Sequence, residues 1–306
     1  MSTIASPPLE VVDPHIHLWD LWTRIYPHFE KPSPDGSNAA ICRSYLLEEY
    51  LGEGKGEVRA VGAVHVEAFP TDPVKETATL AKVAETSPVP LVIVSYGDLT
   101  SADFPALLDR HAAFPIFRGI RQVVNQHDDP QRSYGVPDRM SHPNFLGGLR
   151  ELGRRGLTFD LQLYPHQMEQ AAALAAKAPD TTFVLNHAGM WADRHLEGWK
   201  QYKAGLRTLA TQPNVAVKIS GLGMLDPKWT TEGIRPLVLE TLEAFGTERS
   251  MFASNFPVDK LYSDFPTVWR AFAAIVADLS ESEKAALFRD TARRTYRVPL
   301  SNVGQG

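Results

Sequence analysis

Short apolar segments alternate along the chain with longer segments that have helical periodicity. The apolar segments are rich in valine, isoleucine and leucine and have the length of strands. This pattern predicts eight strands, at residues 11–17, 57–67, 90–96, 116–121, 157–163, 181–186, 214–220 and 250–255. It predicts helices at 45–52, 75–85, 101–112, 144–155, 166–178, 193–212, 231–245, 265–277 and 282–296.

Strands that alternate with helices indicate βαβ units and a parallel sheet. The predicted strands are apolar on both faces, as expected for a parallel sheet covered by helices. Eight units in about 300 residues favour an α/β fold of the (β/α)₈ TIM-barrel type, with one domain over residues 1–306. The rival is a doubly wound open sheet, which usually has a glycine-rich turn after its first strand.

Composition narrows the classes of protein. The chain has 306 residues, with 31 Lys and Arg against 36 Asp and Glu, and this net charge of −5 argues against a nucleic-acid binder. The one cysteine, Cys42, rules out an intrachain disulfide and favours a reducing, cytoplasmic location. We expect no signal peptide and no membrane span, because no basic n-region or long apolar run is present.

The first predicted strand ends in His15, Ile16 and His17. Side chains two positions apart on a strand face the same side, so the two histidines point together. Two such imidazoles can hold a divalent metal or polarise a substrate. For an isolated motif of this kind, a core histidine beside a surface histidine is the better interpretation.

Polar residues at the ends of the other strands change that balance. In a TIM barrel the active site lies at the carboxyl ends of the strands, and polar groups buried there are costly unless paired. Seven of the eight predicted strands end in such groups. They are His15 and His17; His65 and Glu67; Arg118 and Arg121; Asp160, Gln162 and Tyr164; Asn186 and His187; Lys218 and Ser220; and Ser254 and Asn255, with Asp259 just beyond.

Six of these segments carry a family resemblance. They are Asp-Pro-His-Ile-His-Leu-Trp (13–19), Val-His-Val-Glu-Ala (64–68), Phe-Arg-Gly-Ile-Arg (117–121), Leu-Asn-His-Ala-Gly (185–189), Val-Lys-Ile-Ser-Gly (217–221) and Phe-Ala-Ser-Asn-Phe-Pro-Val-Asp (252–259). Together they resemble the amidohydrolase superfamily, in the branch that contains lactonases of sugar acids and of pyrone dicarboxylate. The resemblance runs from the first strand to the eighth and implies the same barrel.

The chain departs from this family at Asn255. The resemblance implies an aspartate there that acts as a base and, in metal-bearing members, as a ligand. An amide takes no proton at neutral pH and is a poor metal ligand. The candidate metal ligands therefore reduce to His15, His17 and His187, which suffice for zinc. The resemblance also implies that some members of this branch work without a metal. Two alternatives for the cofactor therefore stay open: one zinc ion, or none.

The resemblance also implies roles for individual residues. His15, His17 and His187 would polarise a carbonyl oxygen, directly or through a metal, and Asn255 and Asp259 belong to the catalytic set. The base is left open between Asp259, Glu67 and a histidine. The candidate substrate-binding residues are Glu67, Arg121, Tyr164 and Lys218.

Arg121 is preferred as the anchor for a substrate carboxylate. Arg118 lies three positions earlier and so faces the other side of a regular strand. The planar guanidinium of Arg121 can bind two carboxylate oxygens. Structural roles remain as alternatives: an ion pair for Lys218, a loop contact for Asp259 and an internal hydrogen bond for His187.

Three functions follow from this reading. The first is a hydrolase that opens the ring of a small anionic lactone, derived from a sugar acid or a dicarboxylate, by water attack. The second is a decarboxylase of a small aromatic or unsaturated acid, which releases bicarbonate. The third is an inactive barrel that binds a ligand, and Asn255 keeps this alternative open. No nucleic-acid or membrane partner is expected, and a homo-oligomer is neither required nor excluded.

Overall fold

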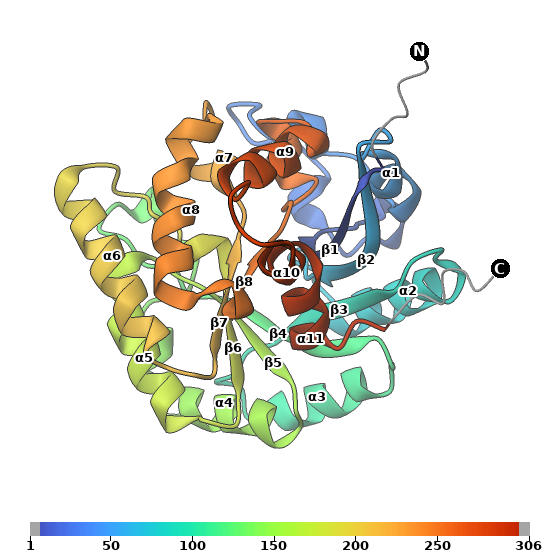
Figure 1. Ribbon diagram of the computed structural model, residues 1–306. Helices are drawn as coiled ribbons and strands as arrows, with labels where there is room; N and C mark the ends of the chain where they lie inside the picture. Colours follow the sequence, from blue (N-terminus) through green and yellow to red (C-terminus); the bar gives the residue numbers. More distant parts are fainter. Residues whose placement is uncertain (1–6, 300–306) are drawn as a thin grey trace, which may run out of the picture.

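A computed structural model describes residues 7–299 and shows a single-domain (β/α)₈ barrel, as predicted. Its strands are parallel and neighbour one another in chain order (Figure 1). They are β1 (Leu9–Ile16), β2 (Val58–Val66), β3 (Leu91–Tyr96), β4 (Phe117–Val123), β5 (Thr158–Gln162), β6 (Thr182–Leu185), β7 (Val215–Ile219) and β8 (Ser250–Phe252).

Helices cover the outside of the strands. They are α1 (Leu47–Gly52), α2 (Pro73–Thr86), α3 (Phe104–Ala112), α4 (Phe145–Arg154), α5 (Met168–Lys177), α6 (Leu196–Ala210), α7 (Leu222–Leu225), α8 (Thr231–Phe245), α9 (Phe265–Ile275), α10 (Glu281–Ala285) and α11 (Thr291–Tyr296). The expected helix at 282–296 is one helical run in which a π-helical turn, Ala286–Asp290, joins α10 to α11. Within the described chain, no helix is both long and apolar enough to cross a membrane.

The inside of the barrel is a packed core. Valines from alternate strand positions, among them Val64, Val92 and Val184, form one buried cluster. Ala292 and Tyr296 of α11 join this cluster, so the last helix contributes to the barrel interior. Branched side chains fill a barrel of this size completely, and the space for a ligand must therefore lie outside the strand ends.

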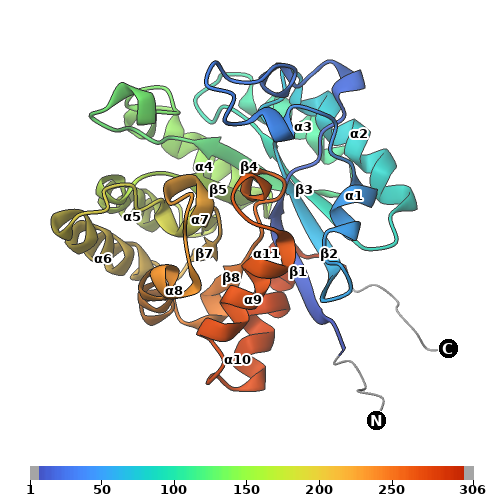
Figure 2. The same cartoon turned by 90° about the horizontal axis from the view of Figure 1, so that it is seen from above.

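Two long connections provide that space. Residues 17–46, after β1, and residues 124–144, after β4, contain only short 3₁₀ turns. Figure 2 shows these segments, coloured blue and green, along the same edge of the molecule. Both long connections therefore lie at the carboxyl ends of the strands.

Several strands are shorter than the sequence predicts, and β8 differs most. β6 ends at Leu185 and β8 at Phe252, whereas the predicted strands continue to 186 and 255. His187 and Asn255 both have left-handed backbone conformations, with φ of 53° and 58°. Such a conformation turns the chain out of the strand and is uncommon for residues other than glycine.

The ring of strands closes between β8 and β1. Ile16 and Phe256 form a short parallel bridge. The backbone N–H of Asn255 donates to the carbonyl of His15 at 2.9 Å, and that of His17 donates to Phe256 at 2.8 Å. The two strand ends are thus joined by residues of the expected site itself.

The buried side chain of Asp13 strengthens this closure. Its Oδ1 accepts from the backbone N–H of Ser254 at 3.1 Å and of His15 at 3.3 Å, and its Oδ2 accepts from the Tyr50 hydroxyl at 3.1 Å. Asp13 has no exposed surface, and burial raises its pKa to about 6 despite these hydrogen bonds.

Replacing Asp13 should therefore weaken the barrel. Asp13→Ala leaves the Ser254 N–H and the Tyr50 hydroxyl without an acceptor, at a cost of about 1–3 kcal/mol for each buried group. The free energy of unfolding is measured by urea titration. Tyr50→Phe removes one of these bonds and should cause a smaller loss. An unchanged urea midpoint in Asp13→Ala would show that closure does not depend on this carboxylate.

Candidate active site

A cavity of about 330 Å³ opens at the carboxyl ends of the strands. Its lining includes residues from both long connections and from the ends of β1, β2, β4, β5, β6 and β8. The side chains with polar groups in this lining are His17, His28, Asn38, Arg121, Tyr134, Gln162, His187, Asn255 and Tyr262. Four of the expected site residues therefore reach one cavity.

The structure brings the three expected histidines together. The ring centroid of His15 lies 5.0 Å from that of His17 and 4.6 Å from that of His187. His17 and His187 line the cavity, whereas His15 is fully buried behind them. The predicted convergence of these side chains is thus seen, and their chemical roles stay predictions.

Hydrogen bonds orient the two histidines of the cavity. His17 Nδ1 lies 2.8 Å from the carbonyl oxygen of Val66, and a carbonyl can only accept, so Nδ1 carries the proton. His17 Nε2 therefore keeps its lone pair when the ring is neutral. His187 Nδ1 lies 2.9 Å from the hydroxyl of Ser220.

Burial keeps these imidazoles neutral. Desolvation is the largest cause of a pKa well below the ordinary value of 6.5 at His15, His17 and His187. The charge of Arg121 lowers all three pKa values further, and that of Lys218 lowers those of His15 and His187. A neutral imidazole with an unprotonated nitrogen is ready to accept a proton.

Lys218 belongs to a buried ion pair. Its Nζ lies 2.6 Å from Asp160 Oδ2 and 3.5 Å from His15 Nδ1. The hydroxyl of Tyr296 donates to the same carboxylate at 2.9 Å, and Asn186 Nδ2 donates to it at 3.1 Å. Lys218 has no exposed surface and stands apart from the described lining of the cavity. This placement favours the structural ion pair over substrate binding.

Arg121 lies in the cavity wall and is already paired. Its Nη1 donates to Glu67 Oε1 at 3.1 Å, and its Nη2 donates to Gln162. Glu67 Oε2 accepts from the backbone N–H of Phe69 at 2.7 Å, and burial raises the Glu67 pKa against the opposing charge of Arg121. Arg118, by contrast, is half-buried and bonds backbone carbonyls outside the site, as its strand position predicts.

Asp259 supports Asn255 from behind. Asn255 Nδ2 donates to Asp259 Oδ2 at 2.6 Å, and the backbone N–H of Gly223 donates to Oδ1 at 2.9 Å. Burial raises the Asp259 pKa to about 7. Asp259 is absent from the described cavity lining, so this geometry favours a role in holding Asn255 over direct contact with a substrate.

Tyr164 also lies away from the cavity. Its hydroxyl donates to the carbonyl oxygen of Arg132 at 2.8 Å, which ties the end of β5 to the connection after β4. The cavity wall contains instead several apolar residues that strand-end reasoning missed, among them Phe69, Met190 and Tyr262. They lie in connections, where periodicity carries no signal of which side chains turn inward.

A divalent metal does not fit the donor set as the structure arranges it. Within residues 7–299, no group of three or more His, Cys, Asp or Glu side chains is placed so that it could hold a metal ion. An ammonium that donates to His15 Nδ1 also leaves the ring proton on Nε2, where a metal would need a lone pair. The arrangement of the described residues thus gives no support to the zinc hypothesis, and no chemical step below depends on it.

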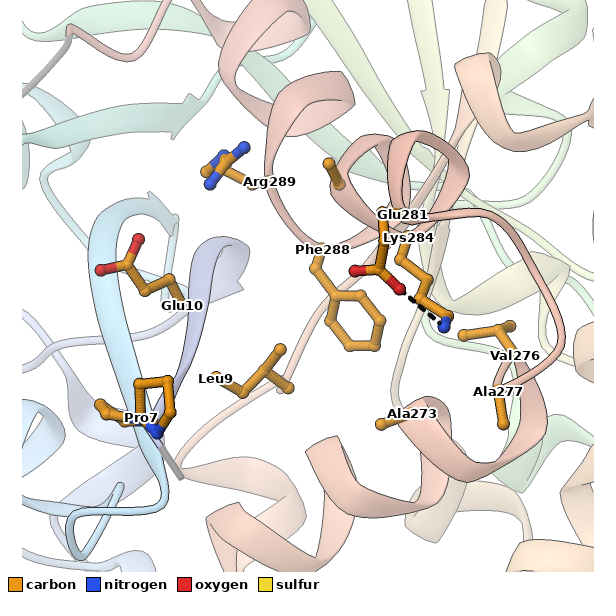
Figure 3. Close-up of a pocket in the computed structure, with 12 residues that line it drawn as sticks. Pro7, Leu9, Glu10, Ala273, Val276, Ala277, Glu281, Lys284, Phe288 and Arg289 are labelled. Atoms are coloured by element: carbon orange, nitrogen blue, oxygen red, sulfur yellow. Dashed lines mark hydrogen bonds and ion pairs between the residues drawn. The ribbon is translucent and has the colours of Figure 1, made fainter. Parts of the chain in front are cut away.

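A second cavity, of about 610 Å³, lies at the other end of the barrel (Figure 3). Leu9 and Glu10, at the start of β1, line it together with Phe288. Glu281 and Lys284 form an ion pair of 3.1 Å beside it. Its described lining contains no histidine, and its two carboxylates, Glu10 and Glu281, each form an ion pair, with Arg59 and Lys284.

The fold and site define a TIM barrel with an imidazole-lined cavity at its carboxyl end. The sequence profile of the amidohydrolase family matches residues 12–298, and the chain belongs to this family. An uncharacterized protein of Sinorhizobium fredii, y4mH, is 46% identical over 97% of this chain and 100% of its own.

Two relatives carry more information. An L-fucono-1,5-lactonase of Burkholderia ambifaria is 27% identical over 94% of this chain and 95% of its own. A crystal structure of an amidohydrolase from Burkholderia multivorans with bound zinc superposes with a TM-score of 0.78. That structure is 25% identical and matches 94% of this chain and 99% of its own.

Asn255→Asp should make stability more dependent on pH. In the wild type, folded Asp259 holds a proton up to about pH 7, whereas its ordinary pKa is 3.8. This group's contribution to stability is therefore lost as the pH rises between these values. In Asn255→Asp a second carboxylate lies beside Asp259, and the two must share one proton. The loss of stability with rising pH should therefore continue above pH 7. Urea midpoints at pH 6 and 8.5 measure the difference.

The matched control is the exchange variant Asn255→Asp with Asp259→Asn. It keeps one amide and one carboxylate in contact and should follow the wild-type pH dependence. Equal pH dependence of the single variant and the wild type would contradict the Asn255–Asp259 contact.

The same substitution tests the metal question. A carboxylate beside three imidazoles is a better donor set for zinc than an amide. We expect Asn255→Asp to retain more zinc per chain than the wild type after dialysis against zinc and then buffer, measured by elemental analysis. Equal zinc content in both would show that position 255 does not control metal binding.

Proposed function

We propose that the protein hydrolyses a small lactone by direct attack of water on the ring carbonyl. The reaction takes place in the cavity at the carboxyl ends of the strands, which His17 lines. The observation that carries this proposal is the hydrogen bond from His17 Nδ1 to Val66, which leaves Nε2 unprotonated at the cavity. The lactonase relative and the family membership support the reaction class.

His17 acts as the general base in this mechanism. Water attacks the carbonyl carbon and gives one proton to His17 Nε2, while the carbonyl oxygen becomes negatively charged. A base in this position contributes about 10²–10⁴-fold to the rate. The pKa of His17 lies well below its ordinary value, so the ring is neutral and able to accept a proton at physiological pH, although burial also makes it a weaker base.

His187 stabilises the charge that develops on oxygen. Either group can donate in the contact between His187 Nδ1 and the Ser220 hydroxyl, and we propose that the hydroxyl does. The ring proton then lies on Nε2 and can be donated to the oxyanion. The intermediate then collapses, the ring C–O bond breaks, and His17 returns its proton to the departing oxygen. The product is a hydroxy acid, and the base is regenerated.

Arg121 is the proposed anchor for one substrate carboxylate. Its guanidinium has five N–H donors: Nη1 donates twice to Glu67, Nη2 donates once to Gln162, and the buried Nε has no partner among the described residues. The second N–H of Nη2 is the donor left for a substrate. The ion pair with Glu67 already balances its charge, so we propose that the site takes a substrate with at most one carboxylate.

His17→Asn should remove most of the activity. Asparagine keeps a polar side chain but accepts no proton, so we expect a loss of about 10²–10³-fold in kcat with a small change in KM. Acid release from a panel of lactones in a pH-stat measures the rate. The control is His142→Asn, an exposed histidine outside the cavity. Full activity of His17→Asn would refute this base.

Arg121→Lys should weaken the binding of a carboxylate-bearing lactone much more than the binding of an uncharged lactone. Lysine keeps the charge but loses the planar, two-pronged donor geometry. We expect KM to rise about tenfold for the charged lactone, in line with the loss of one charge-assisted hydrogen bond. Steady-state kinetics on both substrates measure the ratio, and equal effects on the two would exclude Arg121 as the anchor.

A further inference from the structure

Phe69 is an aromatic side chain held at the cavity under backbone strain. It lines the cavity, yet 48% of its surface is exposed. Its φ is 54°, in the left-handed region that L residues rarely adopt. Pro70 follows, and the residue before a proline is pushed towards extended conformations. Neither burial nor backbone preference therefore explains its position.

Contacts from the site hold Phe69 in this conformation. Glu67 Oε2 accepts from its backbone N–H at 2.7 Å, and the guanidinium carbon of Arg121 lies 5.6 Å from its ring centroid. The His28 ring lies 5.7 Å away. A strained and exposed residue that is fixed by polar groups of a site is typical of ligand contacts.

The rest of the wall has the same chemistry. Phe29, Ile41, Met190, Met224, Leu261 and Tyr262 all line the cavity. Two polar members of the wall are partly engaged: Gln162 accepts from Arg121, and Asn255 donates to Asp259. Other polar side chains reach the cavity, among them His28, Asn38 and Tyr134, but most of the exposed wall is apolar. Hydroxyl groups of a sugar ring that were buried against this apolar surface would lack partners, which is unfavourable.

We propose that the substrate carries an apolar ring that lies against Phe69, so that the lactone opened here is aromatic or alkyl rather than polyhydroxylated. The choice of a lactone rests on the proposed function, whereas the ring contact rests on the cavity wall. The ring would lie on Phe69 and the methionine side chains, with the ester group towards His17 and His187.

A pair of six-membered lactones tests the substrate class. 3-Isochromanone has a fused benzene ring, and D-glucono-1,5-lactone has hydroxyl groups; both release an alkoxide. We expect kcat/KM to be at least about tenfold higher for 3-isochromanone, in line with the energy of one aromatic contact. Faster opening of the sugar lactone would overturn this inference and leave lactone hydrolysis standing.

Binding of the matching lactam separates the two proposals. The lactam analogue of 3-isochromanone has the same rings but is not hydrolysed under these conditions, and calorimetry measures its Kd. Phe69→Ala should raise the Kd for the lactam about tenfold, whereas Phe69→Tyr should bind the lactam like the wild type. Trp22→Ala is the control, because Trp22 is 83% exposed and absent from the described cavity lining.

Phe69→Gly distinguishes a binding role from a structural one. Glycine adopts a positive φ without strain, so this variant should unfold at an equal or higher urea concentration than the wild type while its lactam affinity falls. Unchanged lactam affinity in Phe69→Ala and Phe69→Gly would refute the ring contact. Lactam binding without hydrolysis of either lactone would refute the proposed reaction instead.

Discussion

Closure of the barrel between β8 and β1 is the constraint on which the site depends. The same short stretch of backbone hydrogen bonds joins His15 to Asn255 and His17 to Phe256. Because these bonds fix the ends of both strands, they also fix the imidazoles relative to the amide at position 255. Asp13 adds a buried carboxylate that holds both strand ends at once.

The electrostatics follow from this packing. The two buried cations near the histidines have anionic partners, Arg121 with Glu67 and Lys218 with Asp160. The imidazoles lie close to these cations and are almost completely buried, so the protein keeps them neutral. This favours proton acceptance and hydrogen-bond donation over the binding of a strongly charged substrate.

Much of the site could be predicted from residue types at strand ends. His15, His17, His187 and Arg121 were placed together because the carboxyl ends of parallel strands meet at one end of a barrel. The same reasoning could not tell the residues that line the cavity from those that lie behind its wall. Lys218 and Tyr164 end their strands as expected, but their side chains bond Asp160 and the Arg132 carbonyl instead.

The sequence by itself determined the order of strands and helices, the barrel and the residue types gathered at its carboxyl end. Periodicity and alternation are local properties, so they can be read without knowing what packs against what. The tertiary structure alone decided which nitrogen of His17 carries the proton, that Asp259 stands behind Asn255, and that Phe69 lies at the cavity. These features depend on contacts between segments distant in the chain, or on a backbone conformation that those contacts hold in place.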